Sequence, residues 1–286
     1  MNDETGTRAC VIGWPVEHSR SPLIHGYWLR RYGVAGRYDR RAVQPEELED
    51  FLLGLAGEGL RGGNVTIPHK ERAWEIISEA NPEGIGRMGN RLKAVNTVWL
   101  DEVGRLHADN TDVHGFMANF HDRLGDWNGT GRHVVVLGAG GAARAVIAGF
   151  VDVGVRNVTV VNRTVEKAEK MAEELGEPVR ALPLEKLGEV MPEADVFVNA
   201  TSLGMTGQPS LDLDLSPLPD DAVVADIVYV PLETDLLKRA RQRGLRTVDG
   251  LGMLLHQAVP GFEKWFGVRP DVTPELRRLV EADLAS

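Results

Sequence analysis

The segment from His133 to Arg144 constrains the fold more than any other part of the chain. An apolar run, His133-Val134-Val135-Val136-Leu137, leads directly into Gly138-Ala139-Gly140-Gly141-Ala142-Ala143-Arg144 and then into an apolar helical stretch. This order of buried strand, glycine turn and helix is typical of a dinucleotide-binding βαβ unit. Gly138 permits the tight turn, Gly140 lets the main chain approach a pyrophosphate, and the small Ala142 lets the helix pack closely. The alternative is a tight turn that binds no ligand.

The end of the next expected strand, at 157–161, indicates which dinucleotide is bound. Asn162-Arg163-Thr164 begins 24 residues after Gly138, where an NAD site would carry an Asp or Glu for the ribose 2′-hydroxyl. Arg163 and Lys167 are four positions apart and can converge on one helical face, with the Thr164 hydroxyl beside them, which suits a 2′-phosphate. This pattern favours NADP over NAD. Alternatively, Arg163 is a solvated residue and Thr164 only caps a helix.

A length of 286 residues suits two domains, which we place at 1–112 and 113–251, with 252–286 completing the first. The second is expected to be a Rossmann-like doubly wound sheet of about six strands, at 133–137, 157–161, 179–181, 195–199, 223–227 and 246–248. The first alternates strands and helices, which predicts a mostly parallel sheet. Its strands are expected at 9–13, 38–43, 95–100 and around Leu60, Val65 and Ile67, and its helices at 22–32, 45–56 and from Lys70.

Connecting segments are predicted from glycine and polar residues. The interval 81–90 is expected to be an exposed, mobile loop, and 124–132 is the best linker candidate, so that a helix at 113–122 would bridge the two domains. Ser21, before Pro22, is expected to cap the first helix. The tail predicts two helices, at 252–266 and 273–284.

Composition narrows the classes of function. Hydrophobic residues make up 43% and charged residues 26% of the chain, and no apolar run is long enough to span a bilayer. The polar start Met1-Asn2-Asp3-Glu4 is unlike a secretory signal, and the single Cys10 lies in an apolar run, which favours a buried thiol in a reducing compartment, the cytoplasm. A net charge of −10 argues against non-specific binding to nucleic acid or to an anionic membrane, but leaves local positive pockets open.

Lys70 ends the heptad Asn64-Val65-Thr66-Ile67-Pro68-His69-Lys70, where a short strand meets the start of a helix. This places Lys70 near the carboxyl end of the strand, the edge at which open α/β sheets bind their ligands. The alternative is a solvated lysine on the first helical turn.

Three further polar clusters accompany Lys70: His18-Ser19-Arg20-Ser21-Pro22, Ala94-Val95-Asn96-Thr97 and Asp109-Asn110-Thr111-Asp112. Taken singly, the serines and Asp112 can be helix caps, and Asn96 and Thr97 can be polar residues at a strand edge. In this order, ahead of the glycine turn and Asn162-Arg163-Thr164, the clusters resemble the shikimate dehydrogenase family. The resemblance continues through the segments 199–202, 226–229 and 249–257 and covers nearly the whole chain.

The resemblance implies NADPH-dependent, reversible reduction of 3-dehydroshikimate to shikimate, in aromatic amino acid biosynthesis. Lys70 and Asp112 match the family's catalytic pair. The positions that match its substrate contacts are Ser19, Ser21, Thr66, Asn96, Tyr229 and Gln257. Such a lysine ammonium can stabilise and protonate the carbonyl oxygen, hydroxyls can hold the carboxylate, and the amides of Asn96 and Gln257 can donate to and accept from ring hydroxyls.

For the cofactor, the resemblance implies that Thr201 and Ser202 line its groove and that Ile227 and Gly250 approach the nicotinamide. The full expected cofactor site is Gly138, Ala139, Gly140, Gly141, Ala142, Asn162, Arg163, Thr164, Lys167, Thr201, Ile227 and Gly250. The resemblance also implies that the tail helices return to the first domain, where Gln257 would complete a cleft. His18, His69 and His256 form no plausible metal triad, so no metal is expected.

The sequence departs from the family in two places. The approach to Asn96, from Gly84 to Lys93, is longer and bulkier than usual, which puts the local pocket wall in doubt. Val113-His114 follows Asp112 where a glycine is common, which puts the hinge in doubt. A quinate or quinate/shikimate dehydrogenase and a non-catalytic sensor of NADP or of the ring acid remain alternatives. We expect a small-molecule substrate and a monomer or homodimer.

Overall fold

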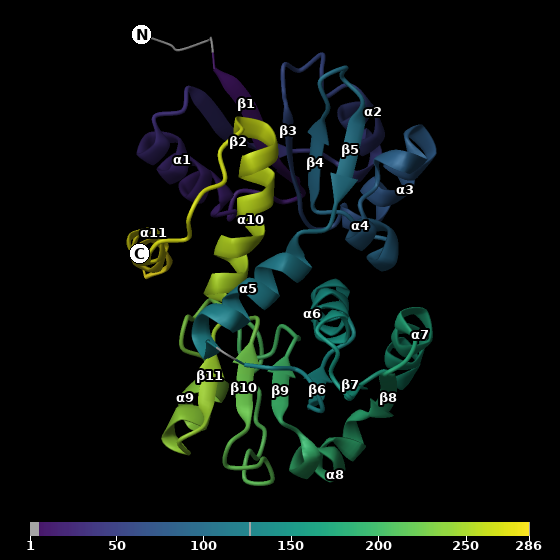
Figure 1. Cartoon of the computed structure of the whole chain (residues 1–286), viewed down its shortest axis with the longest axis vertical. Helices are drawn as coiled ribbons and strands as arrows, with labels where there is room; N and C mark the ends of the chain where they lie inside the picture. The colour runs from purple at the N-terminus through teal and green to yellow at the C-terminus, as the bar shows by residue number, and fades with distance from the viewer. Residues whose placement is uncertain (1–5, 126, 286) are drawn as a thin grey trace. The chain divides into compact units, whose positions relative to one another are not determined.

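The computed structural model describes residues 6–125 and 127–285. The chain divides into two compact units. Unit 1 contains the residues up to Thr111 together with Gln257–Asp283, and unit 2 contains Asp112–His256 and the chain's last residues from Leu284. Their strands and helices are labelled in Figure 1. Among the described residues, no helix has both the length and the apolar character needed to cross a membrane.

Unit 1 is built on a five-stranded sheet with the strand order β2-β1-β3-β4-β5. The strands are β1 (Thr7–Gly13), β2 (Gly36–Ala42), β3 (Gly62–Val65), β4 (Thr97–Leu100) and β5 (Leu106–Asp109). β1 is parallel to β2 and β3, whereas β4 pairs antiparallel with both β3 and β5. Asn64 is therefore opposite Thr97, and Thr97 is opposite Asp109. As a result, the carboxyl ends of β1, β3 and β5 and the amino end of β4 share one edge of the sheet.

Helices from both ends of the chain cover this sheet. They are α1 (Ser21–Tyr32), α2 (Leu48–Leu53), α3 (Lys70–Ala80), α4 (Arg87–Leu92), α10 (Leu251–Phe266) and α11 (Pro274–Leu284), with 3-10 turns η1 (Pro45–Glu47) and η2 (Pro82–Gly84). The tail is attached by polar and aromatic contacts. Trp265 of α10 donates its indole N–H to the carbonyl of Val98 over 2.8 Å, and Phe262 packs edge-on against Trp28. Burying such large rings favours docking of the tail onto unit 1.

Unit 2 is a parallel six-stranded sheet with the order β11-β10-β9-β6-β7-β8. The strands are β6 (His133–Leu137), β7 (Asn157–Asn162), β8 (Val179–Pro183), β9 (Val196–Asn199), β10 (Val223–Asp226) and β11 (Arg246–Val248). The helices are α5 (Asp112–Leu124), α6 (Gly141–Asp152), α7 (Val165–Leu175), α8 (Leu187–Val190) and α9 (Asp235–Gln242), with η3 (Leu184–Lys186) and η4 (Met191–Glu193). The strand order reverses between β6 and β9, which is the doubly wound arrangement, and the fold class is confirmed.

Several local predictions were wrong. The interval 81–90 forms η2 and the start of α4 instead of an exposed loop, because Asp109 accepts the N–H of Gly89 over 2.7 Å and draws this segment against β5. Strand β5 itself was not foreseen. β3 ends at Val65, so Ile67 does not continue its alternation and its side chain is 75% exposed.

Two further expectations also need correction. Arg20, not Ser21, is the cap residue of α1, and its side chain makes no capping hydrogen bond. The proposed linker 124–132, in which Asp126 lies outside the described residues, belongs to unit 2, where Thr130 pairs with Val155. Helix α5 is likewise part of unit 2.

Candidate functional site

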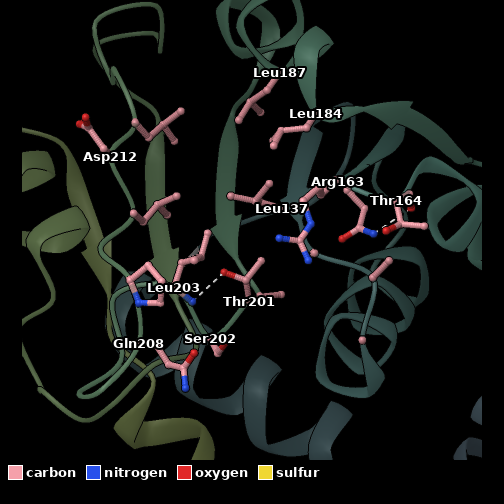
Figure 2. A pocket seen from close by; sticks show the side chains of 18 of the residues that line it. Leu137, Arg163, Thr164, Leu184, Leu187, Thr201, Ser202, Leu203, Gln208 and Asp212 are labelled. Carbon is pink, nitrogen blue, oxygen red and sulfur yellow. Dashed lines mark hydrogen bonds between the residues drawn. The ribbon is translucent and has the colours of Figure 1, made fainter.

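A cavity of about 1000 Å³ opens in unit 2 where the strand order reverses. It is lined by residues that follow β6, from Leu137 to Gly140, and by residues that follow β9, from Ala200 to Leu203. Open parallel sheets bind ligands at this place because the loops from the two strands leave in opposite directions and separate there. Figure 2 shows the side chains that line this cavity.

The glycine turn has the geometry that a bound pyrophosphate requires. Gly138 has φ +115°, a backbone conformation that strains residues with a side chain. In addition, a Cβ at this position would lie only 2.8 Å from the carbonyl oxygen of Ala200. Gly140 is the cap residue of α6 and supplies no side chain, and a Cβ there would meet open space. The first N–H groups of α6 therefore have room for an anion at the positive end of the helix dipole.

The loop after β7 forms a positively charged wall of the cavity. Asn162 donates its side-chain N–H to the carbonyl of Thr164 over 2.8 Å, which closes the loop. Arg163 precedes α7 and is not on its face, but Arg163, Thr164 and Lys167 all line the cavity. Figure 2 shows the Arg163 guanidinium extending towards the middle of the cavity.

The side chains of this wall are available for a ligand. Thr164 precedes α7 but makes no side-chain capping bond, so the capping interpretation of this residue is not supported. Arg163 and Lys167 have no ion-pair partner within the described parts of the chain. Two cations and a hydroxyl without a carboxylate fit the 2′-phosphate of NADP better than the free 2′-hydroxyl of NAD.

The sequence did not indicate the rest of the cavity lining, which combines leucines with polar residues. It is formed by Leu184, Leu187 and Gly188, which follow β8, and by a loop that contains Leu203, Gln208, Pro209, Ser210, Leu211, Asp212 and Leu213. Arg239 of α9 holds this loop through its main chain, donating to the carbonyls of Leu211 and Leu213 over 2.6 and 2.9 Å. Because main-chain acceptors leave no mark in the sequence, this part of the site has no motif.

A buried hydrogen-bond network fixes Thr201 at the cavity wall. Asn199, at the end of β9, accepts from the Thr201 hydroxyl over 2.7 Å and donates to Asp226, at the end of β10, over 3.0 Å. Asp226 also accepts from the hydroxyl of Thr234 and from the N–H of Val228. Burial raises the pKa of the Asp226 carboxyl to about 6, although these hydrogen bonds favour its charged form.

Some expected cofactor residues lie outside this cavity. Gly141 and Ala142 start α6 behind the turn. Ile227 and Gly250 do come together, because a Cβ on Gly250 would lie 2.2 Å from the Ile227 carbonyl oxygen, so only glycine permits this approach of the two loops. Ser202 lines the cavity beside Thr201.

In unit 1, the expected substrate residues gather at the shared edge of the sheet. Thr66 follows β3, with its N–H bound to the carbonyl of Ile12, and Lys70 begins α3. The main chain of Lys70 is tied to the segment that precedes β4, because its carbonyl accepts from the N–H of Val95 over 2.9 Å. His69 is buried and its Nε2 lies 2.8 Å from the carbonyl oxygen of Val43, so it anchors the start of the helix.

Asn96 is oriented by its neighbours. Its Oδ1 accepts from the main-chain N–H of Thr111 over 2.7 Å. Its Nδ2 consequently points to Oε1 of Gln257, 3.4 Å away. The Thr111 hydroxyl lies 3.0 Å from Oδ1 of Asn96 and 2.8 Å from the carbonyl oxygen of Gln257, and its single proton is donated to one of these two acceptors. The role of the Asn96 amide as a substrate contact stays a prediction, and one lone pair of its Oδ1 is already used by the N–H of Thr111.

A second layer of polar residues, which the sequence did not single out, supports Asn96. Tyr38 donates to Oδ1 of Asn64 over 2.7 Å, and Nδ2 of Asn64 donates to the carbonyl of Asn96 and to the hydroxyl of Thr97. Burial raises the pKa of the Tyr38 phenol well above its usual value, so the phenol keeps its proton and acts as a donor. Asn64 and Thr97 did lie in recognised clusters, but only strand pairing shows that they meet.

Ser19 and Ser21 lie in the loop between β1 and α1 and at the first residue of α1. The Ser21 side chain is buried beside the Tyr38 phenol, and the main-chain N–H of Ser21 donates to the Ser19 hydroxyl over 3.3 Å. Of the remaining expected residues, Asp112 and Tyr229 belong to unit 2. Asp112 is buried, begins α5 and directly follows Thr111 in the chain.

Models of protein families match three parts of the chain. Residues 11–98 match the shikimate dehydrogenase substrate binding domain, 121–206 match the shikimate/quinate 5-dehydrogenase family, and 250–274 match the shikimate 5′-dehydrogenase C-terminal domain. The matches cover both units and the tail.

Individual relatives agree with these models. A shikimate dehydrogenase (NADP⁺) from Nitrobacter hamburgensis is 54% identical over 99% of this chain and 97% of its own length. The shikimate 5-dehydrogenase of Thermus thermophilus, solved with NADP(H) and shikimate, has a TM-score of 0.83 and 36% identity, covering 97% of this chain and 99% of its own. The quinate dehydrogenase of Corynebacterium glutamicum, solved with NAD, has a TM-score of 0.88 and 31% identity, with coverage of 97% and 99%. On this evidence, the chain belongs to the shikimate dehydrogenase family.

Proposed function

We propose that this protein is an NADP-dependent shikimate dehydrogenase that reversibly reduces 3-dehydroshikimate to shikimate. The observation that carries this proposal is the wall of Arg163, Thr164 and Lys167 in a dinucleotide cavity, in a chain 54% identical to a shikimate dehydrogenase (NADP⁺). The residues fit NADP, because the glycine turn leaves space for the pyrophosphate and the two cations match the 2′-phosphate.

Lys70 and Asp112 are the proposed groups for proton transfer. NADPH, when bound, supplies the hydride for the ring carbonyl carbon. The Nζ of Lys70 stabilises the negative charge that develops on the carbonyl oxygen and donates a proton to it; in the reverse direction it accepts the proton of the hydroxyl. The Asp112 carboxylate is proposed to hold the Lys70 ammonium in place and to accept from a neighbouring ring hydroxyl.

The remaining polar residues are proposed to hold and orient the substrate. The hydroxyls of Ser19, Ser21 and Tyr229 bind the carboxylate. Asn96 donates to a ring hydroxyl through Nδ2, since its Oδ1 is held by Thr111. Gln257, whose Oε1 faces Asn96, and Thr66 contribute further contacts.

Each of the two domains predicted from the sequence is proposed to bind one of the two ligands. Residues 1–112, completed by 252–286, would bind the substrate, and 113–251 would bind NADP. We also infer a cytoplasmic location. It is supported by Cys10, which is fully buried in β1 and whose pKa burial raises to about 12, so that the thiol is unreactive and typical of a reducing compartment.

A quinate dehydrogenase is the second candidate, because the C. glutamicum quinate dehydrogenase has the same fold. Initial rates with shikimate and quinate, each with NADP and NAD, separate the candidates. We expect the highest kcat/KM with shikimate and NADP. A preference for quinate with NAD would refute the proposal.

Replacing Lys70 tests the proton-transfer role. Lys70→Ala is expected to lower kcat by about 10² to 10⁴, because general acid-base groups usually contribute that much. Shikimate binding by calorimetry and the melting temperature serve as controls for the site and the fold. Turnover within a few-fold of the parent, with both controls unchanged, would show that another group moves the proton.

A further inference from the structure

Two arginines hold the loop that carries Ser19 and Ser21. Arg40, on the edge strand β2, donates through Nε and Nη2 to the carbonyl oxygen of Ser19, over 3.2 and 2.6 Å. Arg20 donates through Nη1 to the carbonyl of His18, one residue earlier, over 2.7 Å. Both contacts fix main-chain atoms directly before the start of α1.

The two arginines differ in their charge balance. Nε of Arg20 lies 2.9 Å from a carboxylate oxygen of Asp283 in α11, so its charge is paired. Arg40 has no acidic partner in residues 6–125 and 127–285, and its neighbour Asp39 pairs with Arg37 instead. The positive charge of Arg40 is therefore uncompensated and lies against the carbonyl of a proposed substrate residue.

A carboxylate bound at Ser19 and Ser21 needs a source of positive potential. Hydroxyl groups donate hydrogen bonds but carry no charge. The amino end of α1, which begins at Ser21, supplies a partial positive charge. The guanidinium of Arg40 supplies a full one, and it polarises the Ser19 peptide group from the carbonyl side.

We propose that Arg40 is a positioning and specificity-determining residue for the carboxylate of the substrate. It orients the Ser19 loop through two hydrogen bonds, and its unpaired charge favours an anionic ring acid over a neutral ring of the same shape. This inference rests on the proposed binding of the substrate carboxylate at Ser19 and Ser21.

The test compares shikimate with its neutral carboxamide in Arg40→Gln. Calorimetry without cofactor gives Kd for both ligands, and initial rates with NADP⁺ give KM and kcat. We expect the Kd and KM of shikimate to rise about tenfold, kcat to change less than about threefold, and the Kd of the carboxamide to change less than about twofold, because only the anion loses an attractive charge. The KM for NADP⁺ should stay unchanged.

Arg20→Gln is the matched control, because it removes a hydrogen bond to the main chain of the same loop, whereas the charge of Arg20 is already paired with Asp283. It should affect shikimate and the carboxamide equally. Arg40→Lys keeps the charge with a different donor geometry and should restore most of the preference for shikimate.

The outcomes separate the inference from the proposed function. If the parent itself binds shikimate and the carboxamide equally, the proposed carboxylate site is wrong. If the parent discriminates and Arg40→Gln weakens both ligands to the same extent, or neither, Arg40 is only a structural clamp or has no role, and the inference is overturned. Loss of discrimination in Arg40→Lys equal to that in Arg40→Gln would also overturn it.

Discussion

Removing the positive wall of the dinucleotide cavity should abolish the preference for NADP. Arg163 and Lys167 line the cavity and form no ion pair with the described residues, so their replacement by glutamine breaks no internal contact. A unit charge about 4 Å from another contributes about 1 kcal/mol in water and about 4 kcal/mol at an effective dielectric constant of 20. Both side chains are exposed, so we take a value near the lower limit, about 1.4 kcal/mol for each cation.

This value converts to a tenfold loss in kcat/KM with NADP for each single variant and about a hundredfold loss for the double variant. The kcat/KM with NAD, which lacks the 2′-phosphate, should change by less than about twofold. Initial rates of shikimate oxidation with both cofactors provide the ratio. Salt should reduce binding of NADP to the parent more than to the double variant, because exposed charges are screened.

Lys170 offers a matched control, since it is an exposed lysine on the same helix, α7, but does not line the cavity. Lys170→Gln should leave both kcat/KM values within about twofold of the parent. If the double variant Arg163→Gln/Lys167→Gln keeps the NADP to NAD ratio of the parent within a factor of about three, the 2′-phosphate is recognised elsewhere and the reasoning is refuted.

Three other changes test the packing around the two sites. Tyr38→Phe leaves Oδ1 of the buried Asn64 without its 2.7 Å donor, so it should cost about 1–3 kcal/mol in urea unfolding and raise the KM for shikimate. Tyr32→Phe is the control, because the Tyr32 phenol makes its contact with the N–H of Asp271 at the exposed surface, and it should cost less than about 0.5 kcal/mol. Equal costs would contradict the network. His25 is fully buried among aromatic rings, and burial lowers the pKa of its imidazole to about 3. Because this pKa is lower than in the unfolded protein, the stabilising contribution of His25 is present above the unfolded pKa of 6.5 and is lost as the pH falls. The parent should lose about 2 kcal/mol relative to His25→Phe between pH 8 and pH 5 in denaturant titrations, and parallel curves for the two proteins would exclude this cause. Gly138→Ala combines a φ of +115° with a Cβ 2.8 Å from the Ala200 carbonyl, and it should weaken NADP binding in a fluorescence titration by at least about tenfold; an unchanged Kd would show that the turn relaxes.

The parts of the fold that were predictable from the sequence are those governed by local rules. The central strands β6, β9 and β10 of unit 2 are buried and mostly apolar, and the turn after β6 needs glycine at position 138 for its positive φ, so both leave a clear pattern. The prediction of an exposed loop at 81–90 was wrong because the structure of this segment depends on contacts with residues distant in the sequence. Its glycines suggested a loop, but close packing requires them. A Cβ on Gly86 would lie 2.2 Å from the carboxylate of Asp109, which belongs to a strand that was itself missed.

The same distinction applies to the two parts of the candidate site. The charged wall of Arg163 and Lys167 was recognisable because cations, and no carboxylate, follow the strand at the position where an NAD site carries an Asp or Glu. The leucines of the cavity lining were not, because Leu184, Leu187 and Leu211 resemble many other leucines of the sequence and are brought to the cavity only by the order of the strands.

Residue type also does not determine what an amide can recognise. A sequence shows that Asn96 has a donor and an acceptor, but Thr111 takes the acceptor and Gln257 fixes the direction of the donor. Thr111 is held opposite Asn96 because β4 and β5 pair antiparallel, with Thr97 opposite Asp109, and Gln257 arrives from the far end of the chain on α10. Because an amide with both faces free accepts many hydroxyl arrangements and one with a fixed donor accepts few, the selectivity expected of this position comes from the hairpin and the returning helix as much as from the asparagine itself.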